Sequence, residues 1–194
     1  MATNIGKKHS FAGINFDFTN RGSLTLDIIG HLQDALDAFT EELGSTPTSP
    51  TFEYIFDMNL HDMPLSEKNR KIFHSVFARM LYVGKRTRPD HLVAVAFLGT
   101  RTLKADVNDW KKLNMLLVYI KGTLNDPLIL RSDNTNIIKW WTDASYGVHE
   151  DVKSHIDGFM TLGSGNVYVT GCKHKLNTVS STESELVTNS DILP

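Results

Sequence analysis

Cysteine and long apolar runs are almost missing from this sequence. Cys172 is the only cysteine among 194 residues, so no internal disulfide can form. Cys172 and His174 alone are too few ligands for a tetrahedral zinc site. No stretch reaches the roughly 18 apolar residues of a membrane-spanning helix, and the N-terminus lacks the pattern of a signal peptide. We therefore expect a soluble, intracellular protein, in the cytoplasm or the nucleus, without membrane contact.

The sequence also lacks a large net charge, because 20 basic and 22 acidic residues give −2. The charges are nevertheless segregated: residues 1–67 hold 3 basic and 10 acidic groups, residues 68–121 hold 12 and 3, and residues 122–194 hold 5 and 9. A basic block of this length can follow a phosphate backbone, or it can receive the acidic flanking segments. The candidate nucleic-acid ligands in this block are Lys85, Arg86, Arg88, Lys111 and Lys112.

Apolar periodicity predicts a β-hairpin and then a helix in the first third of the chain. Apolar residues alternate over residues 11–18 and 24–28, on either side of turn-forming residues 19–22. A helical pattern follows through Leu43, and Gly44 stands where a helix C-cap is expected. Prolines at three positions then predict an extended connection over residues 45–67: Pro47, Pro50 and Pro64.

The pattern changes from helices to strands near residues 122–127. Three helices are expected: one ended by Pro89, one over residues 92–99, and one from an Asp106 N-cap to Gly122. Short β-rich runs follow at residues 128–130, 137–142, 156–162 and 166–171. A capping box at residues 180–183 then opens a last helix. The predicted fold class is α+β.

Acidic residues in the last segment are candidates for a metal site. Asp143 ends the strand predicted at residues 137–142, and Glu183 and Glu185 begin the last helix. An acid on a strand and another on the following helix can meet at a sheet edge and hold a divalent metal for phosphodiester hydrolysis. The spacing is equally compatible with purely structural roles, because Asp143 fits a turn and Glu183 fits the capping box.

Several motifs occur in an order that resembles the copia-type retrotransposon polyprotein. The first two resemble the segment beyond the polymerase palm, and the others resemble the start of the ribonuclease H domain. They are MLYVG at 80–84 with TRPD at 87–90; Trp110 with YIKGT at 119–123; TDAS at 142–145 with KS at 153–154 and DGF at 157–159; and SSTESEL at 180–186.

The resemblance implies a division of the chain into three parts. Residues 1–67 correspond to the end of the palm and thumb, 68–124 to a basic helical connection region, and 125–194 to a partial, mixed α/β ribonuclease H-like domain. The complete family enzyme copies RNA into DNA and cleaves RNA in RNA–DNA hybrids with Mg²⁺. Asp143 matches its first metal-binding carboxylate, and Glu185, followed by leucine, matches the second. Glu183 is the alternative.

The resemblance also implies that parts of the family enzyme lie outside this chain. The fingers, most of the palm and the Tyr-x-Asp-Asp motif would precede it, and the later ribonuclease H aspartates would follow Pro194. Within the chain, Ser145 replaces a second acid, and residues 170–175 lack the family's tryptophan. We therefore expect weak or absent Mg²⁺ binding and no appreciable cleavage by this chain alone. The alternatives are a non-catalytic nucleic-acid-binding module, acting with the rest of a polyprotein, and a non-functional transposon relic.

Overall fold

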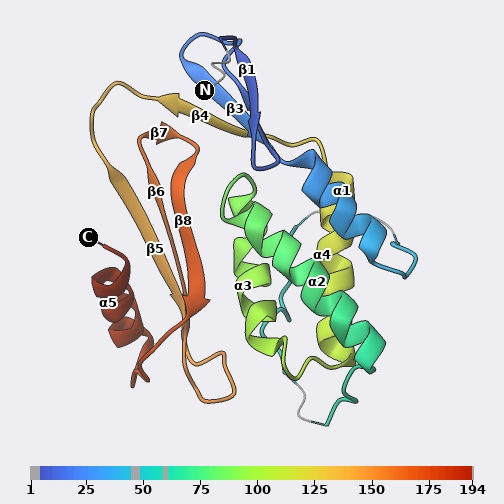
Figure 1. The fold of residues 1–194 in the computed structure, drawn as a ribbon. Coiled ribbons are helices and arrows are strands. Elements are labelled where there is room, and N and C mark those ends of the chain that lie inside the picture. Colours follow the sequence, from blue (N-terminus) through green and yellow to red (C-terminus); the bar gives the residue numbers. More distant parts are fainter. Residues whose placement is uncertain (1–4, 45–48, 59–60, 194) are drawn as a thin grey trace.

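The computed structural model describes residues 5–44, 49–58 and 61–193, and it combines a helical bundle with two antiparallel sheets (Figure 1). This confirms the α+β fold class. In chain order the elements are β1 (Lys8–Phe11), β2 (Ile14–Asp17), β3 (Ser23–Asp27), α1 (Ile29–Ala38), α2 (Glu67–Gly84), the 3₁₀ turn η1 (Pro89–His91), α3 (Leu92–Arg101), α4 (Val107–Gly122), β4 (Leu128–Ser132), β5 (Lys139–Ser145), β6 (His155–Thr161), β7 (Gly163–Ser164), β8 (Asn166–Lys173) and α5 (Ser181–Ile192).

The first sheet has the order β1-β2-β3-β4-β7. The predicted hairpin is confirmed as β2 and β3, with Phe16 opposite Leu26. The strand β1 was not predicted; it is joined to β2 through Ala12 and Gly13, both at positive φ. The pairing of β4 with β3, which sets Leu130 opposite Leu24, was not predicted either. This sheet therefore joins the two ends of the helical segment.

The helices α1, α2, α3 and α4, called the helical bundle below, contain most of the buried apolar residues. All three helices predicted for residues 70–122 are present, and α4 begins at a capping box formed by Asp106 and Asp109. Phe73 of α2, Phe97 of α3 and Leu117 of α4 are fully buried. Burying one such side chain stabilises a fold by about 1.5–3 kcal/mol. The bundle is thus stabilised mainly by apolar contact between helices.

The prediction that Gly44 caps the first helix was wrong. α1 ends at Ala38, and Phe39 takes an extended conformation at the C-cap. The ring of Phe39 stacks on Trp110 at a centroid distance of 4.6 Å, so tertiary packing ends the helix before its apolar period does. In the connection that follows, Pro47 lies outside the described residues. The described parts, residues 49–58 and 61–66, contain turns and one isolated bridge, from Pro64 to Asp106, instead of helices or strands.

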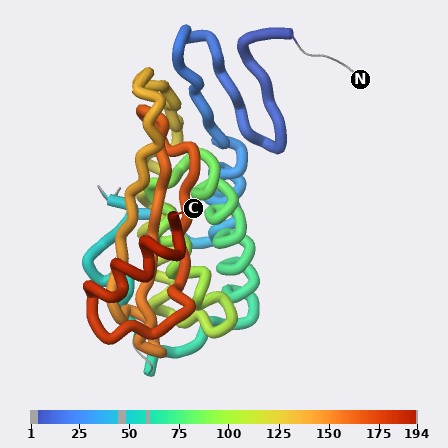
Figure 2. The backbone as a smooth tube through the Cα atoms, turned by 90° about the vertical axis from the view of Figure 1, so that its left-hand side faces the viewer, coloured from blue at the N-terminus to red at the C-terminus, as the bar shows by residue number. Residues whose placement is uncertain are grey.

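The second sheet, of order β5-β6-β8, lies between α5 and α3 (Figures 1 and 2). Two glycines allow the helices to approach. A Cβ on Gly158 would lie 2.8 Å from the Ile192 side chain of α5, and one on Gly171 would lie 3.4 Å from Ala96 of α3. Gly158 therefore faces α5, and Gly171 faces α3. The strands β5, β6 and β8 and the helix α5 are called the sheet unit below.

Within the described ranges, no helix is long and apolar enough to cross a membrane.

Candidate active site

Asp143 lies on the α3 side of the second sheet, opposite another aspartate. It pairs across β5 and β6 with Asp157, which in turn pairs with Gly171 on β8. Directly opposed residues of antiparallel strands share a face, so both carboxylates point to the face that Gly171 shares. Together with residues of η1 and α3, such as Pro89 and Leu92, they line a cavity of about 480 Å³. The site is thus an acidic pair in a cleft with partly apolar walls.

Asp157 is held in an environment that disfavours its charge. Burial, together with the neighbouring charge of Asp143, raises the pKa of Asp157 to about 7. Its buried Oδ1 has no hydrogen-bond partner among the described residues. The carboxyl of Asp157 therefore keeps a proton close to neutral pH.

Asp157 was not predicted as a site residue. The sequence contains it only as the start of the DGF motif, because apolar periodicity does not reveal strand register. Only the pairing of β5 with β6 shows that it faces Asp143.

Glu185 reaches β5 from the opposite side of the sheet. Its Oε1 accepts a hydrogen bond of 3.3 Å from the backbone N–H of Ala144, the residue after Asp143. The hydroxyl of Thr142 also donates to Asn189 Oδ1 at 2.6 Å, which fixes α5 along this strand. Because side chains alternate along a strand, Asp143 and the residues that contact α5 point to opposite faces. Asp143 and Glu185 therefore approach the same stretch of β5 from its two sides.

Glu183 is occupied at the helix N-terminus. Its Oε2 accepts a hydrogen bond of 2.6 Å from the backbone N–H of Val179, while Ser180 accepts from the backbone N–H of Glu183. These bonds satisfy N–H groups that a helix start leaves unpaired. Of the two candidate glutamates, Glu185 is the one that contacts β5.

The oxygen donors at this site match a hard cation in kind but are few in number. Carboxylate oxygens are the ligands that Mg²⁺ takes in proteins, usually with several waters retained. In the described part of the chain, no group of three or more His, Cys, Asp or Glu side chains is placed to hold a metal ion. The residues present fit at most a water-rich Mg²⁺ site on one or two carboxylates.

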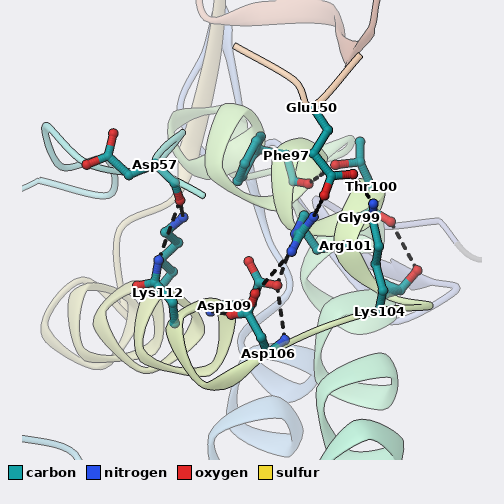
Figure 3. Close-up of polar contacts among 12 residues, drawn as sticks. Asp57, Phe97, Gly99, Thr100, Arg101, Lys104, Asp106, Asp109, Lys112 and Glu150 are labelled. Atoms are coloured by element: carbon teal, nitrogen blue, oxygen red, sulfur yellow. Dashed lines mark hydrogen bonds and ion pairs between the residues drawn. The ribbon is translucent and has the colours of Figure 1, made fainter. Parts of the chain in front are cut away.

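The candidate nucleic-acid ligands fall into exposed and buried sets. Lys85, Arg86 and Lys111 are exposed. Arg88 is only 4% exposed; it donates to Asp90 and to both the backbone oxygen and the hydroxyl of Thr123. Lys112 is fully buried with its ammonium donating to the backbone oxygen of Asp57, and burial lowers its pKa (Figure 3). The structure therefore does not present Arg88 and Lys112 to a phosphate backbone.

The three exposed cations do not form one cluster. The Arg88–Thr123 bonds join the end of α2 to the end of α4. Lys111 lies twelve residues before Thr123, about 18 Å along the helix. Lys85 and Arg86 thus lie near one end of α4, and Lys111 near the other.

Arg101, another residue of the basic block, is buried among carboxylates. Its guanidinium donates to Asp106 and Asp109, each at 3.1 Å, and lies 3.6 Å from Glu150 in the loop between β5 and β6 (Figure 3). Lys104 pairs with the same Glu150. This network links the bundle to the sheet unit.

A transposon protein of yeast is similar to this chain over most of its length. No protein-family model matches the chain, and no solved structure matches it. The "Putative transposon Ty5-1 protein YCL074W" of Saccharomyces cerevisiae is 26% identical over 196 residues, which cover 96% of this chain. The chain spans 61% of that relative's length. The similarity supports a transposon-related origin for this chain.

Proposed function

We propose that the chain is a segment of a copia-type retrotransposon polyprotein that joins the end of the reverse transcriptase to the start of the ribonuclease H domain. The observation that carries this proposal is the contact between the last two motifs. Glu185 of the SSTESEL motif bonds the backbone beside Asp143 of the TDAS motif, although about forty residues separate them. The transposon relative supports the same origin. The remainder of the polyprotein is the expected partner, inside the cell.

The substrate we propose for the complete domain is the RNA strand of an RNA–DNA hybrid. By the resemblance, Asp143 and Glu185 would hold Mg²⁺ in the complete domain; in this chain they approach β5 from its two sides, so each could hold an ion only with several waters. When bound, the metal supplies charge stabilisation and an activated water for phosphodiester hydrolysis. Asp157, with its pKa raised to about 7 by burial, is partly protonated near neutral pH, which limits like-charge repulsion with Asp143. With so few carboxylates, we expect weak Mg²⁺ binding and no appreciable cleavage by this chain alone.

A labelled RNA–DNA hybrid with Mg²⁺ or Mn²⁺ tests this proposal in three arms: the chain, its Asp143→Asn variant, and the chain extended by the family's downstream segment. We expect cleavage only in the extended form. Cleavage by the chain that disappears in Asp143→Asn would show that the catalytic set is already complete. An extended protein that is folded but inactive would count against the assignment of the site.

A non-catalytic nucleic-acid-binding module is the second candidate, and the charge distribution favours it. Nine of the twelve basic residues of the block remain outside the buried core, since only Arg88, Arg101 and Lys112 are buried. Hybrid affinity without cleavage, in the extended form as well, would favour this module over the enzyme. Stop codons in the flanking genomic frame would instead favour a transposon relic.

A further inference from the structure

The solvent-facing side of α2 and its C-terminal end is strongly basic. Residues Phe73, Val76, Met80 and Val83 face the core and are fully buried, which fixes the orientation of the helix. The rest of the helix surface and the residues just after it carry one carboxylate, Glu67, and six basic residues that are exposed or half-buried: Lys68, Arg70, Lys71, Arg79, Lys85 and Arg86.

The acids of the basic block itself do not pair with these cations in the part of the chain that the structure describes. All three acids of the basic block are engaged elsewhere: Asp90 by Arg88, and Asp106 and Asp109 by Arg101. On α2 itself, Glu67 pairs with Lys71 at 2.8 Å, with both side chains more than 70% exposed. Such a pair contributes only about 0.3–0.5 kcal/mol, so an anionic ligand can replace it.

A groove marks the N-terminal end of this surface. It has a volume of about 480 Å³ and is lined by Arg70, Lys71, His74, Thr102 and Leu103. Leu103, 90% exposed, offers an apolar contact beside the cations. The groove thus suits a ligand with an anionic backbone and less polar parts next to it.

The C-terminal end of the surface holds a cation in a fixed orientation. The Arg86 guanidinium lies 3.7 Å from the centre of the Tyr82 ring and donates to the Tyr82 backbone oxygen. Between the two ends, Lys71, Arg79 and Arg86 recur every seven or eight residues, or about 10–12 Å. The whole of α2 is about 27 Å long, the axial length of about eight nucleotides of a duplex strand.

We propose that this face of α2, with the groove at its N-terminal end, is a track for the phosphate backbone of a nucleic acid. It deepens the proposed function by locating where the hybrid is held. An acidic protein is a poorer match, because protein interfaces have an apolar core and are depleted in lysine. The cleft beside Asp143 and Asp157 carries the opposite charge, so it does not serve as the main electrostatic contact.

The test compares two triple variants of the chain that remove equal charge. One replaces Arg70, Lys71 and Arg79 by glutamine. The control replaces Lys7, Arg131 and Lys175, which are exposed and lie outside the basic block. Fluorescence anisotropy with a labelled RNA–DNA hybrid gives Kd across a range of salt concentrations, and thermal melts confirm that both variants are folded.

We expect the α2 variant to bind at least about tenfold more weakly at 50 mM salt, with a log–log salt slope smaller by about 2–3. The control should stay within about threefold of the parent. Unchanged affinity in the α2 variant, with a parent chain that binds, would overturn the track and leave the proposed function standing. If the parent chain does not bind the hybrid, both the α2 track and nucleic-acid binding in the proposed function are wrong. Displacement of the hybrid by polyglutamate at equal charge would overturn the track in favour of an acidic protein.

Discussion

The helical bundle and the sheet unit differ in how completely they satisfy their own buried groups. Of the 24 buried apolar residues described, only Ile156 lies in residues 125–194. By contrast, seven of the ten buried side-chain atoms that lack a hydrogen-bond partner among the described residues lie in that segment, including Nδ1 of His174, whose Nε2 lies 3.5 Å from Asp191 Oδ2. Large apolar side chains such as Trp141 and Leu186 are also more than half exposed there. We therefore expect the helical bundle to be the more stable region and the sheet unit to be the less stable one.

The largest effect should come from breaking the network that links the two regions. Arg101→Ala leaves Asp106 and Asp109 as buried carboxylates without their partner. We expect it to lower the free energy of unfolding by about 3–5 kcal/mol, measured by urea denaturation. The control is Arg79→Ala, whose side chain donates to the hydroxyl of Ser75 at 3.5 Å; it should cost less than about 1 kcal/mol. Equal losses in the two variants would show that the network adds nothing.

The second-largest effect should come from acid, which should weaken the contact between the helical bundle and the sheet unit. His149 and His155 are buried 3.1 Å apart at Phe97. Burial lowers the pKa of His149 to about 4 and that of His155 to about 3, with smaller contributions from Lys173 and His149 respectively. The folded state thus binds fewer protons than the unfolded state below pH 6.5, so stability is full above that pH and falls as pH drops toward 3.

Urea denaturation between pH 7 and pH 4 measures this loss, which we expect to reach on the order of 3 kcal/mol. The double variant His149→Phe and His155→Phe should flatten the profile over the same range. If the free energy of unfolding of the parent does not change between pH 7 and pH 4, the two histidines are not responsible for any acid sensitivity.

Asp157→Asn should have a smaller effect of opposite pH dependence. A folded pKa of about 7 lies above the unfolded value, so the group favours folding at low pH, and this contribution is lost as pH rises through 7. We expect the variant to be more stable than the parent by about 1–2 kcal/mol at pH 8 and equal to it near pH 4. Destabilisation at pH 8 would instead mean that the ionised carboxylate has a partner in solution.

The smallest effect should come from the outer side of α5. Leu186 is 66% exposed, so Leu186→Ala should change stability by less than about 0.5 kcal/mol. The matched change in the bundle, Leu117→Ala, should cost about 2–5 kcal/mol. Thermal melts of both variants compare the regions directly, and a large loss in Leu186→Ala would indicate that another surface covers α5.

The sequence predicted local elements better than long-range contacts. The caps at Asp106 and Ser180 gave correct helix starts because each depends on neighbouring residues alone. The end of α1 was missed because Phe39 packs on Trp110, seventy-one residues away. The burial of a cation also depends on tertiary contacts, so the number of exposed cations in the basic block was predicted too high. Nothing local distinguishes Arg88 and Lys112, which are buried, from Lys85 and Lys111, which are not.

The metal-binding roles that the motifs give Asp143 and Glu185 stay a prediction. The motifs selected Asp143 and Glu185, and the structure brings Glu185 to the strand that carries Asp143. They did not select Asp157, whose position depends on strand register.

The most direct test of the site compares the two glutamates of α5 in the chain extended by the family's downstream segment. Hybrid cleavage with Mg²⁺ should fall more than about 100-fold in Glu185→Gln, because even residues that only orient metal ligands are worth about 10–100-fold. Glu183→Gln should keep most of the activity and lose only cap stability, about 1 kcal/mol. Cleavage that survives Glu185→Gln and disappears in Glu183→Gln would contradict the account.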